Sequence, residues 1–594
     1  MSEGTSFEVT RRDALKLGAG TLAGAAATVA ALQGAPLAAF ASSPSDLNEA
    51  TVAQLQALMA QKKLRSADLV EYYLRRIASL DQSGPTVNSV IELNPDAGDI
   101  AEQLDEERHE RGPRGPLHGI PVLLKDNVDT HDRMQTAAGS LGLVGAPPPR
   151  DSTVAARLRT AGAIILGKTT LSEWANFRST SATSGWSGRG GQCNNPYGID
   201  RNPCGSSSGS GAAASANFTA VSIGTETDGS IVCPAGHNGV VGIKPTVGLV
   251  SRAGVVPISH IQDTVGPHTR TVADAAAVLG ALVGVDPRDP ATQASAGKFF
   301  TDYTQFLNPD GLRGARIGFT RQFEGSNLLT DAVFEQAVQA MTNAGARMVE
   351  VQLPHLDEVN AGAAEFTVLL FDFKVDLKKY LADRTGVPLA HGDLAAAIAF
   401  NKAHAAEEMP FFGQEIFEAA QAIDVNDPAT IAAYLAAVDH DRFIGGTDGI
   451  DRALRENNVI AVVAPTEPPS WSTDLIYGDR FTFGTSSHAA IAGYPIINVP
   501  MGLIFGLPVG ISFMAGAFSE PTLIRLASGY EHATQERRQP KFLPTLPATS
   551  PSGAGGEGGG GDNARVAAQA RAQLAAGART QHGLTGPAVK PHHL

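Results

Sequence analysis

Residues 202–259 read NPCGSSSGSGAAASANFTAVSIGTETDGSIVCPAGHNGVVGIKPTVGLVSRAGVVPIS. Two Gly/Ser-containing turns in this stretch, around Ser206 and Ser230, flank the short apolar run 221–223. An apolar run that carries β-branched residues and is bounded by turn residues is typical of a buried strand. The stretch therefore predicts a strand with a turn at each end, and each turn carries serine hydroxyl groups.

Short apolar runs on both sides of this stretch predict further buried strands. They lie at 120–124, 163–166, 459–464, 496–499 and 511–514. The clearest amphipathic helix is expected over 66–80, starting at Ser66 as a good N-cap, and helical patterns also occur at 154–159 and 333–343. Strands separated by helices indicate an α/β protein with a largely buried sheet. The region 274–440 is richer in helical pattern and is expected to be an elaboration packed on that sheet.

The composition is that of a globular protein. Of the 594 residues, 43% are hydrophobic and 18% are charged, a balance that excludes a wholly disordered or collagen-like chain. The formal net charge of −14 argues against nucleic acid as a partner. Three cysteines are too few and too irregularly spaced for a zinc site or a disulfide-stapled scaffold. They are Cys193, Cys204 and Cys233.

The first 41 residues have the features of a bacterial export signal. Arg11 and Arg12 precede an Ala/Gly-rich, weakly apolar run, and an A-x-A cleavage site ends at Ala41. Because glycines dilute the apolar run, it is a poor membrane anchor. We therefore expect recognition by the twin-arginine export machinery, cleavage near Ala41, a periplasmic or secreted location, and no stable membrane insertion afterwards.

The rest of the chain is expected to form one large folded domain and a tail. The domain covers 42–547, and the tail covers 548–594. The tail is rich in glycine and alanine, so it cannot bury enough apolar surface to offset its ordering entropy and is expected to be disordered. Nothing in the sequence indicates an oligomeric state.

Two strings match the motifs of other protein classes. Residues 162–169 fit the phosphate-loop pattern G-x-x-x-x-G-K-[ST], but the residues between the glycines are apolar and predict a strand. Residues 205–209 fit G-x-S-x-G, which would make Ser207 a nucleophile, but Asn202 and Pro203 occupy the place where a buried strand should end. A nucleotide-binding protein and a catalytically silent binding module stay open as alternatives from other classes.

Several segments together resemble the amidase signature family. Ser206 and Ser230 lie 24 positions apart, as in that family, and GIPVLLKDNVDT places Lys125 directly after the apolar run 120–124. Further similar segments are LGKTTLSEWANFRST, QDTVGP, AGYPIINVPMG and GLPVGISFMAG. The resemblance spans roughly residues 50–540. It is greatest to the bacterial peptide amidase branch, which removes ammonia from C-terminal peptide amides. The segments most similar to this branch are GTETDGSIVCPA, SEWANFRST and SGWSGRGGQ.

This resemblance implies a fold and a set of catalytic roles. The fold is α/β, with a central mixed sheet covered by helices on both faces in a single large domain. Ser230 is the nucleophile of a Ser-cisSer-Lys triad, and Ser206, which follows a cis peptide bond, relays the proton of Ser230 to Lys125. Backbone N–H groups of the turn form the oxyanion hole. The residues of that turn are Thr227, Asp228, Gly229 and Ser230.

These residue types suit amide hydrolysis. A serine hydroxyl is too weak an acid to attack unaided, so an acceptor must remove its proton. Burial can keep Lys125 neutral, because desolvation disfavours the ammonium form. We expect an amidase that cleaves a carboxamide C–N bond through a seryl acyl-enzyme, releases ammonia and needs no metal or organic cofactor. Its substrate is a small-molecule or peptide amide. Alternatives within the class are a general aliphatic or aryl amidase or esterase, and a glutaminase that feeds ammonia to a tRNA-dependent partner.

Because of two departures from the family pattern, the resemblance does not predict which residues form the acyl pocket. Cys204 stands where many members have glycine, and Val232 stands where arginine is frequent. Cys204 could pair with Cys193 after export, but buried free thiols are the expected state. Four aromatic residues are candidates either for a substrate cleft or for core packing. They are Trp174, Phe177, Trp186 and Trp471.

Overall fold

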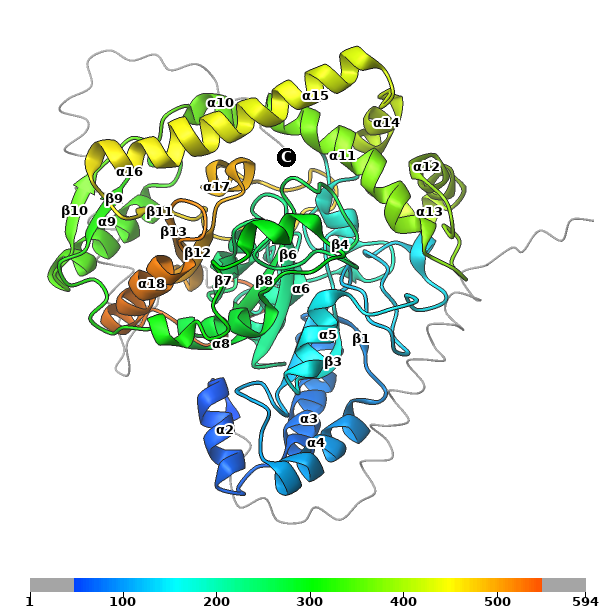
Figure 1. Ribbon diagram of the computed structural model, residues 1–594. Helices are drawn as coiled ribbons and strands as arrows, with labels where there is room; N and C mark the ends of the chain where they lie inside the picture. The colour runs from blue at the N-terminus through cyan, green and yellow to red at the C-terminus, as the bar shows by residue number, and fades with distance from the viewer. Residues whose placement is uncertain (1–46, 547–594) are drawn as a thin grey trace, which may run out of the picture.

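The computed structural model describes residues 47–546. The expected export signal over 1–41 and the expected tail over 548–594 lie outside the described residues. The centre of the described chain is one sheet of eleven strands (Figure 1). In their order across the sheet, the strands are β1 (Val90–Leu93), β3 (Ile164–Thr169), β2 (Pro121–Lys125), β6 (Val221–Glu226), β8 (Thr264–Thr269), β7 (Val241–Lys244), β12 (Ile496–Ile504), β13 (Leu507–Met514), β11 (Val462–Pro465), β9 (Arg316–Phe319) and β10 (Arg347–Glu350).

The sheet is mixed, as expected. β2 pairs in parallel with both β3 and β6, while β8 runs antiparallel to β6 and β7. The six apolar runs of the sequence correspond to β2, β3, β6, β11, β12 and β13. Every residue of β2, β3 and β6 is buried, which is why these strands appear in the sequence as continuous apolar runs.

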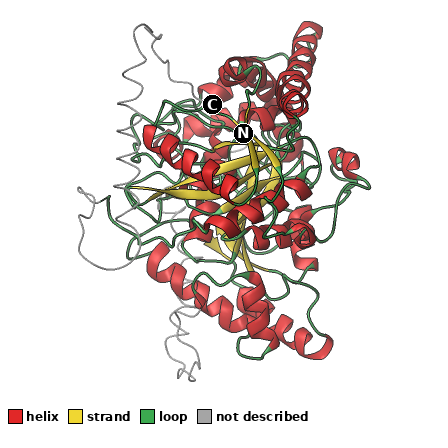
Figure 2. Cartoon of the chain, turned by 90° about the vertical axis from the view of Figure 1, so that its left-hand side faces the viewer, coloured by secondary structure: helices red, strands yellow, loops and turns green. Residues whose placement is uncertain are grey.

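Helices cover both faces of the sheet (Figure 2). α6 and α7 contact each other and pack on β6 and β7. α18 contacts both α8 and α9, and these three helices pack on β8 and β12. None of the helices within residues 47–546 is both long enough and apolar enough to cross a membrane. The helices are α2 (Val52–Ala60), α3 (Ser66–Arg76), α4 (Ala97–Arg111), α5 (Thr153–Thr160), α6 (Ser208–Ser215), α7 (Val232–His237), α8 (Val272–Leu282), α9 (Leu328–Asn343), α10 (Leu356–Ala361), α11 (Ala363–Ala382), α12 (Leu394–Ala403), α13 (Ala405–Glu408), α14 (Glu415–Ala422), α15 (Pro428–Asp441), α16 (Asp451–Asn457), α17 (Ser487–Ala492) and α18 (Glu520–Thr534).

The region 274–440 only partly matches its prediction as a helical elaboration. β9, α9 and β10 lie inside it and complete one edge of the sheet. The elaboration itself consists of α10 to α15, of which α11 and α15 lie side by side above the sheet in Figure 1. β9 and β10 were missed because they are only four residues long and each begins with an arginine.

The α-helical conformation expected over 66–80 ends before residue 80. α3 stops at Arg76 and continues as a π-helical turn over Ile77–Asp81. Ser66 is also not the N-cap, which is Arg65; the Asp105 carboxylate instead accepts the backbone N–H of Ser66 at 2.7 Å. A carboxylate from another helix thus satisfies a free N–H of the first turn, so a serine cap is not needed there.

The string over 162–169 is not a phosphate-binding loop. All of it but the first two residues is the buried strand β3, and the Lys168 ammonium is enclosed in the core, where it donates to the Val128 carbonyl at 2.6 Å and to the Thr136 hydroxyl at 2.9 Å. A lysine held in this way cannot reach a phosphate, so the nucleotide-binding alternative is wrong.

Candidate active site

Lys125 is the last residue of β2, and its side chain is fully buried. Its Nζ donates to Ser206 Oγ at 2.8 Å and to the hydroxyl of Thr225 at 2.8 Å. Thr225 lies on β6, next to β2 in the sheet, so strand pairing positions this contact. Burial lowers the pKa of Lys125 to about 7, against the opposing charges of Asp263 and Glu226. A substantial fraction of the amine is therefore neutral near neutral pH.

Ser206 lies in the first of the two turns. The Gly205–Ser206 peptide bond is cis, which agrees with the resemblance. A Cβ at position 205 would lie 2.2 Å from Ser172 Oγ, so the backbone at Gly205 passes too close to this neighbour for any other residue. On the next residue, Ser207 Oγ donates to the Thr225 carbonyl at 3.0 Å. The Ser207 hydroxyl therefore ties the turn to β6 and is not a free nucleophile.

Ser230 lies in the second turn, directly beyond β6. Its backbone carbonyl accepts the N–H of Ser207 at 3.2 Å, which joins the two turns. Its hydroxyl has no hydrogen-bond partner among residues 47–546, and the residue is 8% exposed. The structure therefore brings Lys125 and Ser206 into contact and places Ser230 beside them on the adjoining turn, without a hydrogen bond between the two serine hydroxyls.

The turn that precedes Ser230 is held from several sides. The Thr227 hydroxyl donates to Asp263 at 2.6 Å, and the Ser487 hydroxyl donates to the Asp228 carboxylate at 2.7 Å. Gly229 has a φ of 76°, in the left-handed region that favours glycine. In the described part of the chain, the backbone N–H groups of residues 227–230 donate no hydrogen bond. Unpaired N–H groups on one fixed turn are what an oxyanion hole requires.

Two polar residues that support Lys125 escaped the sequence reasoning. Thr225 Oγ1 accepts hydrogen bonds from Lys125 and from Asn127 Nδ2, the latter at 2.9 Å. Asn127 follows Lys125 by two positions in the string KDN, which was a usable signal. Thr225 lies near the end of β6 and belongs to no sequence motif, so only the pairing of β2 with β6 could identify it.

The four aromatic candidates lie in different surroundings. Trp174 and Phe177 pack on rings of α11 and α14, and Trp186 packs on Phe411 and Phe412. Trp471 lies against Cys204 and Cys233. Only Trp174 lines a crevice that also includes Asn127. The other residues of this crevice are Ala138, Ala175, Val256, Pro257 and Ile258.

Two buried polar atoms that border this crevice have no hydrogen-bond partner. They are Oδ1 of Asn127 and Nε1 of Trp174. The chain at Trp174 and Ala175 has φ values of 49° and 55°, which are uncommon for these residue types and concentrate at functional sites. Two residues that line the crevice thus each carry a buried polar atom without a partner, one a hydrogen-bond acceptor and the other a donor.

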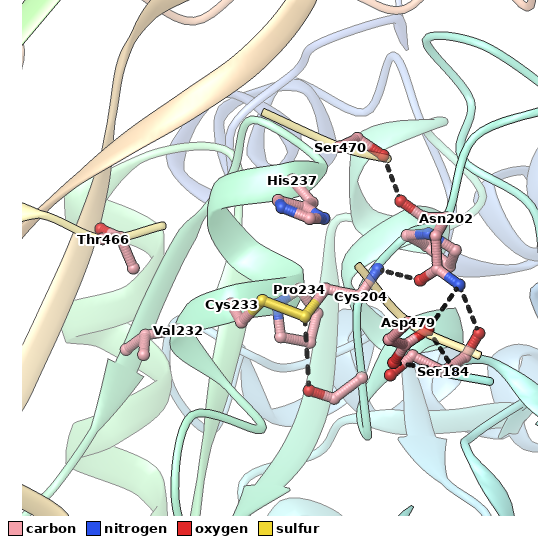
Figure 3. The surroundings of a disulfide bond; sticks show 12 residues. Ser184, Asn202, Cys204, Val232, Cys233, Pro234, His237, Thr466, Ser470 and Asp479 are labelled. Atoms are coloured by element: carbon pink, nitrogen blue, oxygen red, sulfur yellow. Dashed lines mark hydrogen bonds between the residues drawn. A yellow bond between two sulfur atoms is a disulfide. The ribbon is translucent and has the colours of Figure 1, made fainter. Parts of the chain in front are cut away.

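A disulfide bond connects the two serine-bearing turns. Cys204, two residues before Ser206, is bonded to Cys233, three residues after Ser230, as Figure 3 shows. The expected free thiols and the alternative pairing with Cys193 are both wrong for Cys204. Cys193 is buried in the core as a free thiol. The two paired cysteines are 29 positions apart, and they meet because α6 and β6 return the chain to the first turn.

Comparison with known proteins gives consistent matches over most of the chain. The Amidase family profile matches residues 68–524. A probable amidase of Arabidopsis thaliana is 43% identical over 511 residues, covering 84% of this chain and 93% of the relative. A putative amidase of Schizosaccharomyces pombe is 38% identical over 524 residues, covering 84% of this chain and 87% of the relative.

Two solved structures are similar over nearly their whole length. The native peptide amidase of Stenotrophomonas maltophilia is 50% identical, with a TM-score of 0.78, and the match covers 84% of this chain and 99% of that one. An amidase family protein of Bacillus anthracis is 34% identical, with a TM-score of 0.79, and the match covers 88% of this chain and 97% of that one. A further structure shows peptide amidase in complex with chymostatin, a competitive inhibitor, at 50% identity and a TM-score of 0.80, covering 84% of this chain and 100% of that one.

Proposed function

The chain belongs to the amidase family and is a hydrolase of amide C–N bonds, and we propose that its preferred substrate is the C-terminal carboxamide of a peptide. The observation that carries this proposal is the 50% identity to a peptide amidase across 84% of the chain. The unpartnered Asn127 Oδ1 and Trp174 Nε1 also support it, since an acceptor and a donor are what an amide group needs for binding.

In the proposed reaction, Ser230 Oγ attacks the carboxamide carbon. As this bond forms, the Ser230 proton passes to Ser206, and the Ser206 proton passes to the lone pair of neutral Lys125 along their 2.8 Å contact. The backbone N–H groups at 227–230 receive the developing oxyanion. Hydrogen bonds between catalytic groups often form only when substrate binds, so the open Ser230 hydroxyl is compatible with this step.

The C–N bond then breaks, and the proton returns from Lys125 through Ser206 to the leaving nitrogen, which departs as ammonia. Water then attacks the acyl group on Ser230 and gives its proton through Ser206 to Lys125, and the proton returns to Ser230 Oγ as the ester bond breaks. The products are ammonia and the free peptide acid. The three side chains thus accept and return every proton, and each turnover consumes one peptide amide and one water.

Ammonia release across four substrates tests the proposed specificity. The set is a dipeptide amide, the corresponding free amino acid amide, an aryl amide and glutamine. We expect the dipeptide amide to have the highest kcat/KM and chymostatin to inhibit competitively. A higher kcat/KM for glutamine or for the aryl amide would contradict the peptide preference and would favour the glutaminase or the general amidase alternative.

Covalent labelling tests the proposed nucleophile. A fluorophosphonate should add to Ser230 in the intact protein, and the labelled peptide is identified by mass spectrometry. Ser230→Ala should abolish labelling. Ser207→Ala is the matched control, because Ser207 lies on the adjoining turn but its hydroxyl is bonded to the β6 backbone. Labelling that survives in Ser230→Ala but not in Ser207→Ala would refute the assignment in favour of Ser207, and an unaltered protein that takes no label would favour the catalytically silent alternative.

We also propose that the chain is exported by the twin-arginine route and cleaved near Ala41. The paired arginines at positions 11 and 12 support this proposal, and so does the Cys204–Cys233 disulfide, since such bonds persist mainly in oxidising compartments. Expression in a bacterium should give a periplasmic protein whose N-terminus lies near residue 42. Lysines at both arginine positions should retain it in the cytoplasm. An uncleaved cytoplasmic protein from the unaltered sequence would contradict the proposal.

A further inference from the structure

A turn of left-handed backbone carries Trp174, one of the residues that line the crevice. The φ values of Trp174, Ala175 and Asn176 are 49°, 55° and 68°. This conformation is unfavourable for residues other than glycine, so three such residues in a row persist only where the surrounding structure enforces them. The chain enters this turn beside the catalytic serines, since the backbone N–H of Ser172 donates to the Ser206 carbonyl at 3.1 Å. The contacts that hold the turn therefore hold one wall of the crevice.

A buried ion pair joins the two ends of this turn. Glu173 directly precedes it, Arg178 follows it by two positions, and Arg178 Nε lies 3.0 Å from Glu173 Oε1. The two side chains are 0% and 1% exposed, respectively. Glu173 Oε2 also accepts the backbone N–H of Gly188 at 2.6 Å, so both oxygens of this carboxyl group are contacted. Desolvation offsets much of the attraction in a buried ion pair, so its main effect here is to fix the distance between positions 173 and 178.

The helical elaboration encloses this ion pair from the other side. Glu408, the last residue of α13, is fully buried. A Cβ on Gly188 would lie 3.1 Å from Glu408 Oε2 and 3.2 Å from Glu173 Oε2, so the two carboxyl groups face the same point. The Arg178 guanidinium lies over the Phe412 ring, with its central carbon 4.4 Å from the ring centre. Residues of the elaboration thus help to hold the turn that forms the crevice wall.

One guanidinium charge faces two carboxyl groups in this cluster. Burial raises the pKa of Glu173 and that of Glu408, the charge of Glu408 raises the pKa of Glu173 further, and the Arg178 charge opposes both shifts. The two carboxyl groups therefore share one proton near neutral pH, and one carboxylate is left to balance the guanidinium. Within residues 47–546, the Arg178 side chain donates no hydrogen bond. Its charge and its contact with the Phe412 ring are what hold it in place.

We propose that Arg178 is a positioning residue for substrate binding: its ion pair with Glu173 closes the left-handed turn and thereby holds the Trp174 indole in the wall of the crevice. This role rests on the proposed function, since it takes the crevice as the place where the amide substrate binds. Arg178 does not itself line the crevice, so its effect passes through Trp174. Loss of the ion pair should therefore weaken substrate binding and leave the chemical steps nearly unchanged.

Steady-state kinetics of Arg178→Met with the dipeptide amide test the proposal. Methionine removes the charge and retains a long apolar side chain. We expect KM to rise about fivefold, as for the loss of the Trp174 donor, with kcat changed less than about twofold. The rate at which a fluorophosphonate labels Ser230 should also change less than about twofold, because this small probe does not need the crevice. An unchanged KM, or a fall in kcat without a rise in KM, would overturn the proposal.

A double variant tests whether Arg178 acts through Trp174. In the Trp174→Phe background, Arg178→Met should raise KM by less than about a further twofold, because the group that Arg178 positions is already absent. Independent effects, which would multiply to about 25-fold, would refute the link. Arg178→Lys keeps the charge and should recover most of the lost affinity, and a KM as high as that of Arg178→Met would contradict the role of the charge. If Arg178→Met lacks the native near-ultraviolet circular dichroism, Phe412→Leu, which removes only the ring under Arg178, takes its place and should give a smaller rise in KM.

Arg537→Met is the matched control for a general loss of stability. Arg537 pairs with Glu49 at 3.0 Å and donates to the Ser215 carbonyl at 2.8 Å, at the end of α6 that lies away from Ser206. This variant should lower the melting temperature without changing KM, and an equal rise in KM in both variants would refute a specific role of Arg178. If the unaltered protein prefers the aryl amide or glutamine, the peptide preference alone fails, and the same KM comparison with the better substrate decides the role of Arg178.

Discussion

Replacing Lys125 by methionine should stabilise the fold while abolishing catalysis. The ordinary pKa of a lysine is 10.5, and burial lowers that of Lys125 to about 7. Each pKa unit corresponds to about 1.4 kcal/mol, so keeping this amine in the core costs the folded state about 4 to 5 kcal/mol at neutral pH. Methionine has a similar length and no charge, and it removes this cost.

The substitution also removes the three hydrogen bonds that Lys125 Nζ donates to Ser206 Oγ, to Thr225 Oγ1 and to the Thr225 carbonyl, and the free energy lost with them decides the net change in stability. Ser206 Oγ and Thr225 Oγ1 lose the Lys125 donor, at about 1 to 3 kcal/mol for a buried group left without a partner. Thr225 keeps the bond from Asn127, and the Ser206 hydroxyl can rotate towards another acceptor. The expected net gain in unfolding free energy at pH 7 is therefore roughly 1 to 3 kcal/mol.

The sign of the pH dependence provides the sharper test. Between pH 7 and 10.5 the unfolded chain binds the Lys125 proton more fully than the folded chain, so the stability of the unaltered protein rises with pH in this window. The advantage of the methionine variant should therefore shrink by about 2 kcal/mol between pH 7 and pH 9. Below pH 7 both states hold the proton, and the advantage should stay constant.

Scanning calorimetry of both proteins at pH 6, 7 and 9 measures this difference, and ammonia release measures activity. Lys125→Arg is the control, because arginine keeps its charge and should lower the melting temperature. The reasoning is refuted if Lys125→Met melts below the unaltered protein at pH 7, or if the gap between the two melting temperatures does not narrow towards pH 9.

Three further predictions concern the same site. Because only neutral Lys125 can accept a proton, kcat/KM for the dipeptide amide should rise with pH and level off above a midpoint near pH 7. Below this midpoint, kcat/KM should fall about tenfold per pH unit. A flat profile between pH 5 and 9 would contradict this role. Gly205→Ala places a methyl group 2.2 Å from Ser172 Oγ and should destabilise the protein by about 1 to 3 kcal/mol and lower kcat by about 100-fold. Gly115→Ala, which has open space around it, should change neither quantity, and equal effects of the two variants would refute the close-approach argument. Trp174→Phe removes one donor from the crevice and should raise KM for the dipeptide amide by about fivefold with little change in kcat; an unchanged KM would remove the crevice from substrate binding.

Burial explains which strands could be predicted. β2, β3 and β6 lie in the middle of the sheet with both faces covered, so their sequences are continuous apolar runs. β8 lies equally near the middle of the sheet, but its sequence is TVGPHT. Because proline and histidine are atypical of a central strand, Pro267 and His268 kept this strand from being predicted. The surrounding structure pairs some of the polar groups of this strand, since His268 Nε2 lies 2.9 Å from the Ile231 carbonyl.

The sequence by itself determined the α/β class and the amidase resemblance, and it pointed to Lys125, Ser206 and Ser230 as the proposed catalytic set, because motifs and buried apolar runs leave marks within short segments. Tertiary structure alone decided which groups meet. The pairing of β2 with β6 placed Thr225 against Lys125, and the return of the chain through α6 and β6 joined Cys204 to Cys233 rather than to Cys193. Such contacts join positions 29 to 100 residues apart, and no local pattern encodes them, because the free energy that favours them comes from packing the whole core.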